Sequence, residues 1–231
     1  MKLGECITRV LERVGLTATS TEFQNQARHY INMMLAETVP LVQWWWLDRS
    51  TTFATVASTA TYSPVSGNVT SWWSFTDETN NRTLGIIGPT QYDSWDPDQD
   101  TTGDPRSVFI AGQDATTGYP TVSLYPIPDG AYTIRVRYRA DIDEWTSTND
   151  NTDFLTLGIP RIMESVLLYG ACSLYLERQG DDSGASREAG NLDRALKAAR
   201  KQNLAMWGDR SPSTPDYGPL IILDSTLAIA S

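Results

Sequence analysis

The hydrophobic positions near the amino end follow a helical period. Apolar residues recur at spacings of three and four over residues 3–14, which predicts an amphipathic helix that Gly15 ends in a left-handed cap. This stripe consists of Ile7, Val10, Leu11 and Val14. A second helix is predicted over residues 19–40, where Thr19 and Glu22 have the spacing of a capping box. Its stripe consists of Phe23, Ala27, Tyr30, Ile31 and Met34.

The helical period returns near the carboxyl end. The segment IPRIMESVLLYGACSLYLERQG at residues 159–180 is apolar on nearly every side, with Pro160 suited to the first turn and Gly180 to the stop. We therefore expect this helix at the centre of a bundle. A last helix is predicted over residues 183–207. Its inward positions are Leu192, Ala195, Leu196 and Ala199, and its outward positions are Arg194, Lys197, Arg200 and Lys201.

Between these helices, residues 44–140 show β-branched and aromatic residues punctuated by Gly, Pro and Asn. The clearest segment, YPTVSLYPIPDGAYTIRVRYRADI at residues 119–142, predicts a hairpin around a Pro-Asp-Gly turn. Strict alternation after the turn predicts a strand with one core face and one polar face. The core positions are Tyr132, Ile134, Val136 and Tyr138, and the polar ones are Thr133, Arg135, Arg137 and Arg139.

These segments together predict an α+β fold. Helical hairpins within residues 1–40 and 155–207 are expected to form a four-helix bundle, with an antiparallel β domain at residues 41–154 inserted between them. Residues 208–231 are expected to form an extended C-terminal arm. The arm contains an apolar run that is too short for a helix, formed by Leu220, Ile221, Ile222 and Leu223.

Length, composition and charge limit the class of protein. A chain of 231 residues with 40% hydrophobic residues can bury a sizeable core as one large domain or two small ones. Charged residues interrupt the first apolar positions, which argues against a secretory signal. The longest uncharged helical stretch, Ser165–Leu176, has twelve residues where a bilayer needs about 20. The net charge of −10 argues against tight binding to DNA phosphates, but it is compatible with a protein past which DNA moves without binding.

Few residues point to catalysis or to a cofactor. Cys6 and Cys172 lie far apart in apolar helical patterns, so they are expected to be core thiols in a reducing compartment. His29, the only histidine, has no nucleophile motif around it, and no glycine-rich phosphate loop is present. The sequence predicts a protein that is no enzyme and has no cofactor and no metal. Catalysis by His29 or by a carboxylate pair is the alternative, and it requires partners that only the fold could bring together.

An acidic run, DSWDPDQDTTGD at residues 93–104, has the aspartate spacing that begins a calcium loop. The rest of that pattern fails, because Thr101 stands where the tight turn requires Gly and Ser107 stands where the bidentate Glu should be. A solvated loop is therefore favoured over a calcium site.

The chain has eight tryptophans, among them Trp44, Trp45 and Trp46 and the pair Trp72 and Trp73. The run of three follows the predicted second helix, so we expect it to form core at the junction with the β domain, or a subunit interface. Aromatic platforms that stack on sugar rings are the alternative. They lead to a second functional hypothesis, a carbohydrate-binding or carbohydrate-hydrolysing protein that uses the tryptophan and aspartate surfaces.

Arg135, Arg137 and Arg139 are predicted to form a basic ridge in an acidic protein. Two interpretations stay open. The arginines are solvated or paired with the acids of DIDE at residues 141–144, or they contact a neighbouring subunit or another protein.

The order of these elements over residues 1–207 resembles the head-to-tail adaptor (connector or neck) proteins of tailed bacteriophages. The similarity is one of arrangement. It is carried by MKLGECITRVLERVG, by YINMMLAETVP running into WWWLDRSTTF, by GDPRSVFIAG, by VSLYPIPDGAYTIRVRY and by IPRIMESVLLYGACSLYL. The Tyr-Pro-x-Pro turn and the hairpin after it are the most telling pieces, whereas the tryptophan-rich link and the final arm are less typical.

The resemblance implies a virion structural protein that is assembled in the host bacterial cytoplasm. Such adaptors form rings, commonly of twelve subunits, between the portal above and a tail, nozzle or stopper protein below, and their bundle lines the passage for double-stranded DNA. In several of them a C-terminal segment extends into the portal and adds to its structure. In this chain that portal-docking role falls on Leu220, Ile221, Ile222, Leu223, Leu227 and Ile229.

Overall fold

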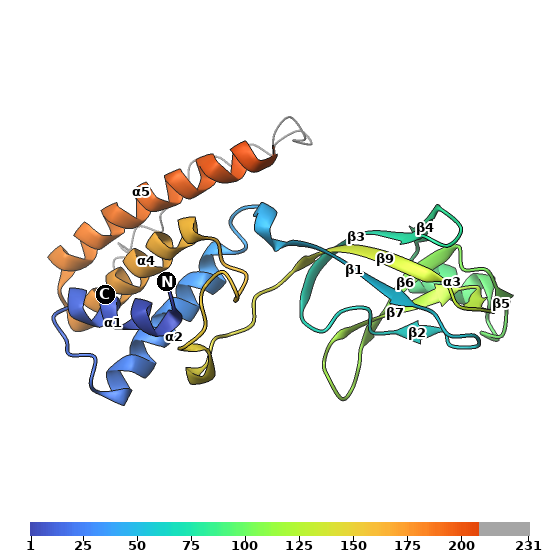
Figure 1. Cartoon of the computed structure of the whole chain (residues 1–231), viewed down its shortest axis with the longest axis horizontal. Helices are drawn as coiled ribbons and strands as arrows, with labels where there is room; N and C mark the ends of the chain where they lie inside the picture. Colours follow the sequence, from blue (N-terminus) through green and yellow to red (C-terminus); the bar gives the residue numbers. More distant parts are fainter. Residues whose placement is uncertain (208–231) are drawn as a thin grey trace, which may run out of the picture.

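A computed structural model of the chain describes residues 1–207. The molecule is elongated, with helices at one end and a curled β-sheet at the other (Figure 1). The fold is therefore α+β, as predicted. The helices of the described part are α1 (Leu3–Arg13), α2 (Thr21–Thr38), α3 (Pro89–Trp95), α4 (Arg161–Gln179) and α5 (Asp182–Trp207).

Local signals set most helix ends. Gly15 (φ 79°) follows the end of α1 and Gly180 (φ 78°) ends α4, and both adopt the left-handed conformation that glycine tolerates best. These two predicted stops are confirmed. The capping box predicted from Thr19 to Glu22 is wrong, because α2 begins one residue later than that motif requires. Ser20 is its N-cap residue, and no side chain caps its first turn.

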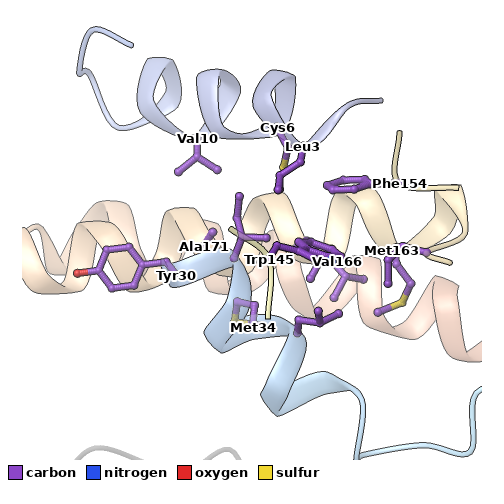
Figure 2. Packing of buried hydrophobic residues seen from close by; sticks show 14 of the residues in the cluster. Leu3, Cys6, Val10, Tyr30, Met34, Trp145, Phe154, Met163, Val166 and Ala171 are labelled. Carbon is purple, nitrogen blue, oxygen red and sulfur yellow. The ribbon is translucent and has the colours of Figure 1, made fainter. Parts of the chain in front are cut away.

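Helix α4 lies at the centre of the helical end, as its apolar composition predicted. It contacts α1, α2 and α5, and its residues Val166 and Ala171 are fully buried. In Figure 2, Leu3 and Val10 of α1 are directed towards the ribbon of α4. The predicted inward stripe of α5 is also confirmed, because its four residues all pack in or against this core, which we call the helical core.

Two segments outside the helices complete the helical core. One follows α2 and the other precedes α4, and together they carry the chain to and from the sheet. The buried residues of these segments are Trp44, Trp46, Leu47, Trp145, Phe154 and Ile159. Trp145 stacks on Phe154 with ring centroids 5.3 Å apart. Both connections to the sheet are therefore fixed to the helices by large buried side chains.

The strands form a seven-stranded sheet in the order β1-β9-β3-β4-β6-β7-β2 and a separate pair, β5-β8. Their bounds are β1 (Asp48–Ala54), β2 (Thr61–Tyr62), β3 (Val69–Asp77), β4 (Arg82–Ile86), β5 (Thr102–Gly103), β6 (Ser107–Gln113), β7 (Pro120–Tyr125), β8 (Ile127–Pro128) and β9 (Thr133–Ala140). β4 pairs with β6, and β5 with β8, in parallel. The sheet is therefore mixed rather than purely antiparallel as predicted, because a long crossover that contains α3 separates β4 from β6.

The predicted hairpin is wrong, because β7 and β9 do not pair with each other. β7 pairs with β6 and β2, and β9 pairs with β1 and β3. The residues between β7 and β9 run beside the segment after β1 instead. The N–H of Thr55 donates to the carbonyl of Tyr132, and the N–H of Ser58 donates to that of Pro128. Proline at 126 and 128 offers no N–H, so this stretch cannot continue a regular two-stranded ladder.

The alternation in β9 is confirmed. Ile134 and Val136 are fully buried in a second hydrophobic cluster, the sheet core, which also contains Phe75, Leu84, Val108, Val122 and Leu124. The opposite side of the sheet at β6 and β7 is covered in part by α3, a helix that the sequence pattern did not predict. Tyr92 of α3 packs on Phe109 and Tyr125, with centroid distances of 4.3 and 5.7 Å.

Candidate protein-interaction surfaces

Three arginines of β9 lie on the side of the sheet that faces away from the sheet core. Residues paired across an antiparallel ladder point to the same side, so the partners of these arginines in β1 and β3 share that side. We call this surface the arginine face. It consists of Asp48, Ser50 and Thr52 of β1, Arg135, Arg137 and Arg139 of β9, and Ser71, Ser74 and Thr76 of β3. Apart from one carboxylate, it therefore presents hydroxyls and guanidinium groups.

Two of the arginines are held by acids. Arg139 donates to Asp48 at 3.0 Å and lies over the ring of Trp73, and Arg135 pairs with Glu78 at 2.9 Å. Partial burial raises the pKa of Asp48 above its usual value, although Arg139 acts against this shift. The prediction that these arginines pair with acids therefore holds for Arg135 and Arg139. The partners are wrong, because they come from β1 and from the end of β3 instead of from residues 141–144.

Arg137 differs from its two neighbours. Its side chain is exposed, and within residues 1–207 it has no hydrogen bond or ion pair. Its register partners are Ser50 on one side and Ser74 on the other. The middle of the arginine face therefore presents one guanidinium group that no acid of the described chain neutralises.

The tryptophans divide between core and surface. Trp44 and Trp46 are buried in the helical core, and the indole N–H of Trp44 donates to the carbonyl of Thr38 at 3.0 Å. The expectation that this run forms core at the junction is confirmed. Trp72 packs against the sheet core, whereas Trp73 is 44% exposed beside Arg139. The pair at 72 and 73 therefore does not form one common platform.

The acidic run forms the end of α3 and the loop after it. The carboxylate of Asp96 is buried and accepts the N–H groups of Asp100 and Thr101, and Asp104 accepts hydrogen bonds from Arg82 and Asn80. Protein donors thus occupy the buried carboxylate of Asp96 and the partly exposed carboxylate of Asp104. No group of three or more His, Cys, Asp or Glu residues within the described chain could hold a metal ion.

The two thiols are buried, whereas the single imidazole is exposed. Cys6 and Cys172 are unpaired and buried, and burial raises the pKa of each thiol to about 12, so both stay protonated at neutral pH. His29 is exposed on α2 and lines a pocket of about 420 Å³ together with Asn32, Asp141 and Glu144. No serine, threonine or cysteine lines that pocket.

Two buried polar residues connect α5 to the rest of the protein by hydrogen bonds. No pattern in the sequence marked either of them. Asn203 is buried, and it accepts the N–H of Trp45 at 2.9 Å and donates to the carbonyl of Gln43 at 3.0 Å. Glu188 is buried and accepts a hydrogen bond from Arg13 of α1 at 2.9 Å. The end of α5 is thereby fixed beside the tryptophan-rich segment that leads into the sheet.

The predicted portal-docking residues lie outside the described residues, so their assignment stays a prediction. They are Leu220, Ile221, Ile222, Leu223, Leu227 and Ile229. Within residues 1–207, no helix combines the length and the apolar character that a membrane crossing requires.

Comparison with known proteins identifies the family. No curated protein matches the chain. A family model described as SU10 adaptor protein matches residues 1–216, which is most of the chain. The match includes the helical core, the sheet and the arginine face. The chain therefore belongs to the SU10 adaptor protein family, a family of phage head-to-tail adaptors, in agreement with the resemblance seen in its sequence.

Proposed function

We propose that this protein is a non-enzymatic structural component of the virion neck that forms a ring between the portal and the tail. In this proposal the ring docks on the portal through the C-terminal arm and joins the tail, nozzle or stopper protein below. Double-stranded DNA passes through the ring without tight binding, and assembly takes place in the host bacterial cytoplasm. The single observation that carries the proposal is the family match over residues 1–216.

The proposed division of labour uses two structural units. The helices at residues 1–40 and 155–207 form a four-helix bundle, and residues 41–154 form an inserted β domain. The presence of two separate hydrophobic cores supports this division. The buried side chains of the two connecting segments, such as Trp46 and Trp145, support a stiff joint between the units. A stiff joint suits a spacer that must hold two large assemblies at a fixed distance.

The arm is proposed to start from a fixed point and to reach another protein. Asn203 holds the end of α5 against the segment at Gln43 and Trp45, which fixes the origin of the arm. Residues 208–218, if extended at about 3.3 Å each, would span roughly 35 Å. Burial of the four apolar residues 220–223 would contribute about 6–12 kcal/mol. Ordering costs about 1–2 kcal/mol per residue, so a single arm binds modestly and a ring of arms binds well.

The charge of the chain suits a passage for DNA. A ring of subunits with a net charge of −10 each repels a duplex that carries about one negative charge per 1.7 Å. We therefore propose a net acidic or neutral lumen. A lumen rich in Lys and Arg, seen in a structure of the ring, would contradict this part of the proposal.

Removal of the arm tests the docking role. We expect a chain truncated before Gly218 to lose binding to the portal protein of the same phage, because the apolar run is gone, and to keep its melting temperature. A variant with serine at residues 220–223 should behave in the same way, whereas a control with alanine at Ser225 and Thr226 should bind like the wild type. A large fall in melting temperature on truncation would instead show that the arm covers its own subunit.

A further inference from the structure

The arginine face has the composition of a binding surface and no described segment covers it. Ser50, Thr52 and Arg137 are exposed, and α3 lies on β6, away from the three strands that form this face. The three arginines outnumber the two acids that hold them, Asp48 and Glu78, so one positive charge stays uncompensated. In a chain with a net charge of −10, this face therefore carries a local excess of positive charge.

The loop at residues 93–100 has the opposite character. Asp93, Asp98 and Asp100 are exposed, and their carboxylates have no hydrogen bond or ion pair within residues 1–207. Together with the buried Asp96, this acidic loop carries four negative charges in eight residues and no positive one. Its position is fixed, because Asp96 accepts hydrogen bonds from the loop backbone and Tyr92 anchors α3 on the sheet.

Each of these two surfaces also has an exposed tryptophan. Trp73 is 44% exposed beside Arg139, and Trp95 is 47% exposed between Asp93 and Asp96. Among the seven tryptophans at residues 44–145, these two are the ones with exposed side chains. Tryptophan and arginine are enriched among the residues that contribute most of the binding energy in protein interfaces. The two surfaces thus match in charge, and both have the residue type that anchors such contacts.

We propose that the arginine face of one subunit binds the acidic loop of a second copy of this chain. The inference rests on the proposed ring, and it names the surfaces that join its subunits. Nucleic acid fits this face less well, because binding to phosphates requires several free cations and only Arg137 is without an acid. A contact between two different surfaces of the same chain is heterologous, and repetition of such a contact closes a ring when the rotation between subunits allows it.

Charge reversal tests the contact. We expect Arg137→Glu to raise the dissociation constant between subunits about tenfold or more, because it puts a carboxylate opposite the acidic loop. The double variant Asp98→Lys, Asp100→Lys should have a similar effect. Lys201→Glu on the exposed side of α5 is the matched control, and it should assemble like the wild type. Mass photometry and sedimentation measure assembly, and the melting temperature checks that each variant folds.

Mixing the two defective variants makes the test specific. In an equimolar mixture, every contact between unlike chains again joins opposite charges, so assembly should recover in the mixture but not in either variant alone. A single chain that carries all three substitutions should also recover. Assembly of both variants at wild-type affinity would overturn the inference and leave the ring intact. A wild-type chain that stays monomeric at every concentration and also when bound to the portal would overturn the ring and the inference together.

Cross-linking gives an independent measurement that does not depend on the effect of charge. Arg137→Cys and Asp98→Cys chains, mixed under mild oxidation, should form a disulfide between unlike chains. The native thiols should not form cross-links, because Cys6 and Cys172 are buried and their pKa is raised to about 12. In the control mixture, a Lys201→Cys chain takes the place of the Arg137→Cys chain and is mixed with the same Asp98→Cys chain. Equal yields in the two mixtures would contradict the proposed contact.

Discussion

At the scale of single residues, Glu188 shows how a charge is kept inside the helical end. Its carboxylate is fully buried and is held by Arg13, Arg187 and Asn191. Burial acts to raise the pKa of this carboxyl, but the hydrogen bonds from Arg13 and Asn191 outweigh burial and bring the pKa below its usual value. The ionised form therefore stabilises the fold and links α5 to α1.

This arrangement predicts a pH-dependent effect of Glu188→Gln. At pH 7 we expect the variant to lose about 1–3 kcal/mol of unfolding free energy, because a buried charged hydrogen bond is replaced by a neutral one. The folded pKa is depressed, so this contribution is present above about pH 4.5, the usual value for the carboxyl, and fades as the pH falls through the folded pKa. Urea titrations at pH 7 and at lower pH measure the difference. A constant difference at all pH values, or an equal loss in the exposed control Glu177→Gln, would contradict this account.

The candidate site illustrates what residue patterns can and cannot provide. Alternation in β9 correctly placed the three arginines on one side, because successive side chains of a strand point to opposite faces. The alternation did not identify the acids that form ion pairs with these arginines. Asp48 is 91 residues from Arg139 in sequence, and Glu78 follows a different strand, so only the tertiary fold determines these pairs.

At the scale of elements, the contact between α2 and α4 depends on a glycine. Gly170 is buried in α4, and a Cβ built there would lie 2.6 Å from the sulfur of Met34 on α2. Figure 2 shows Met34 beside α4. The two helices therefore approach closely because position 170 has no side chain.

We expect Gly170→Ala to cost about 1–3 kcal/mol of unfolding free energy, because the added methyl group overpacks the contact. The double variant with Met34→Ala should be more stable than the sum of the single effects, since the new methyl group then fills space that Met34 left. Gly190→Ala on exposed α5, where a Cβ meets nothing within 4 Å, is the control and should stabilise by about 0.5–1 kcal/mol. Chemical denaturation measures all four chains. Additive losses, or a stabilising Gly170→Ala, would argue against close packing at this position.

The elements themselves were predictable to different degrees. Helices were predictable because their period, stops and apolar stripes are local, as Gly15 and Gly180 show. Strand pairing was not, because β9 lies between β1 and β3 from far earlier in the chain, and no local pattern specifies those neighbours. The short helix α3 was not predictable, because its seven residues, PTQYDSW, form no apolar stripe and run into an acidic segment whose composition is typical of a loop.

At the scale of the whole molecule, the adaptor combines a helical end, a sheet end and an acidic surface. Buried tryptophans fix the joint between the two ends, and the arginine face departs from the prevailing negative charge. In the proposed role, this chain holds its neighbours at a set distance, and its negative charge repels the DNA that passes. The chain belongs to a family of phage head-to-tail adaptors, and the strongest test of its proposed role is its position within the particle.

Electron cryomicroscopy of the intact neck makes that test directly. We predict a ring of this chain between portal and tail, with the side chains of Leu220, Ile221, Ile222 and Leu223 enclosed by portal subunits. The acidic loop of each subunit should lie on the arginine face of the next. A chain absent from the neck, or a ring whose residues 220–223 project into solvent away from the portal, would contradict the account.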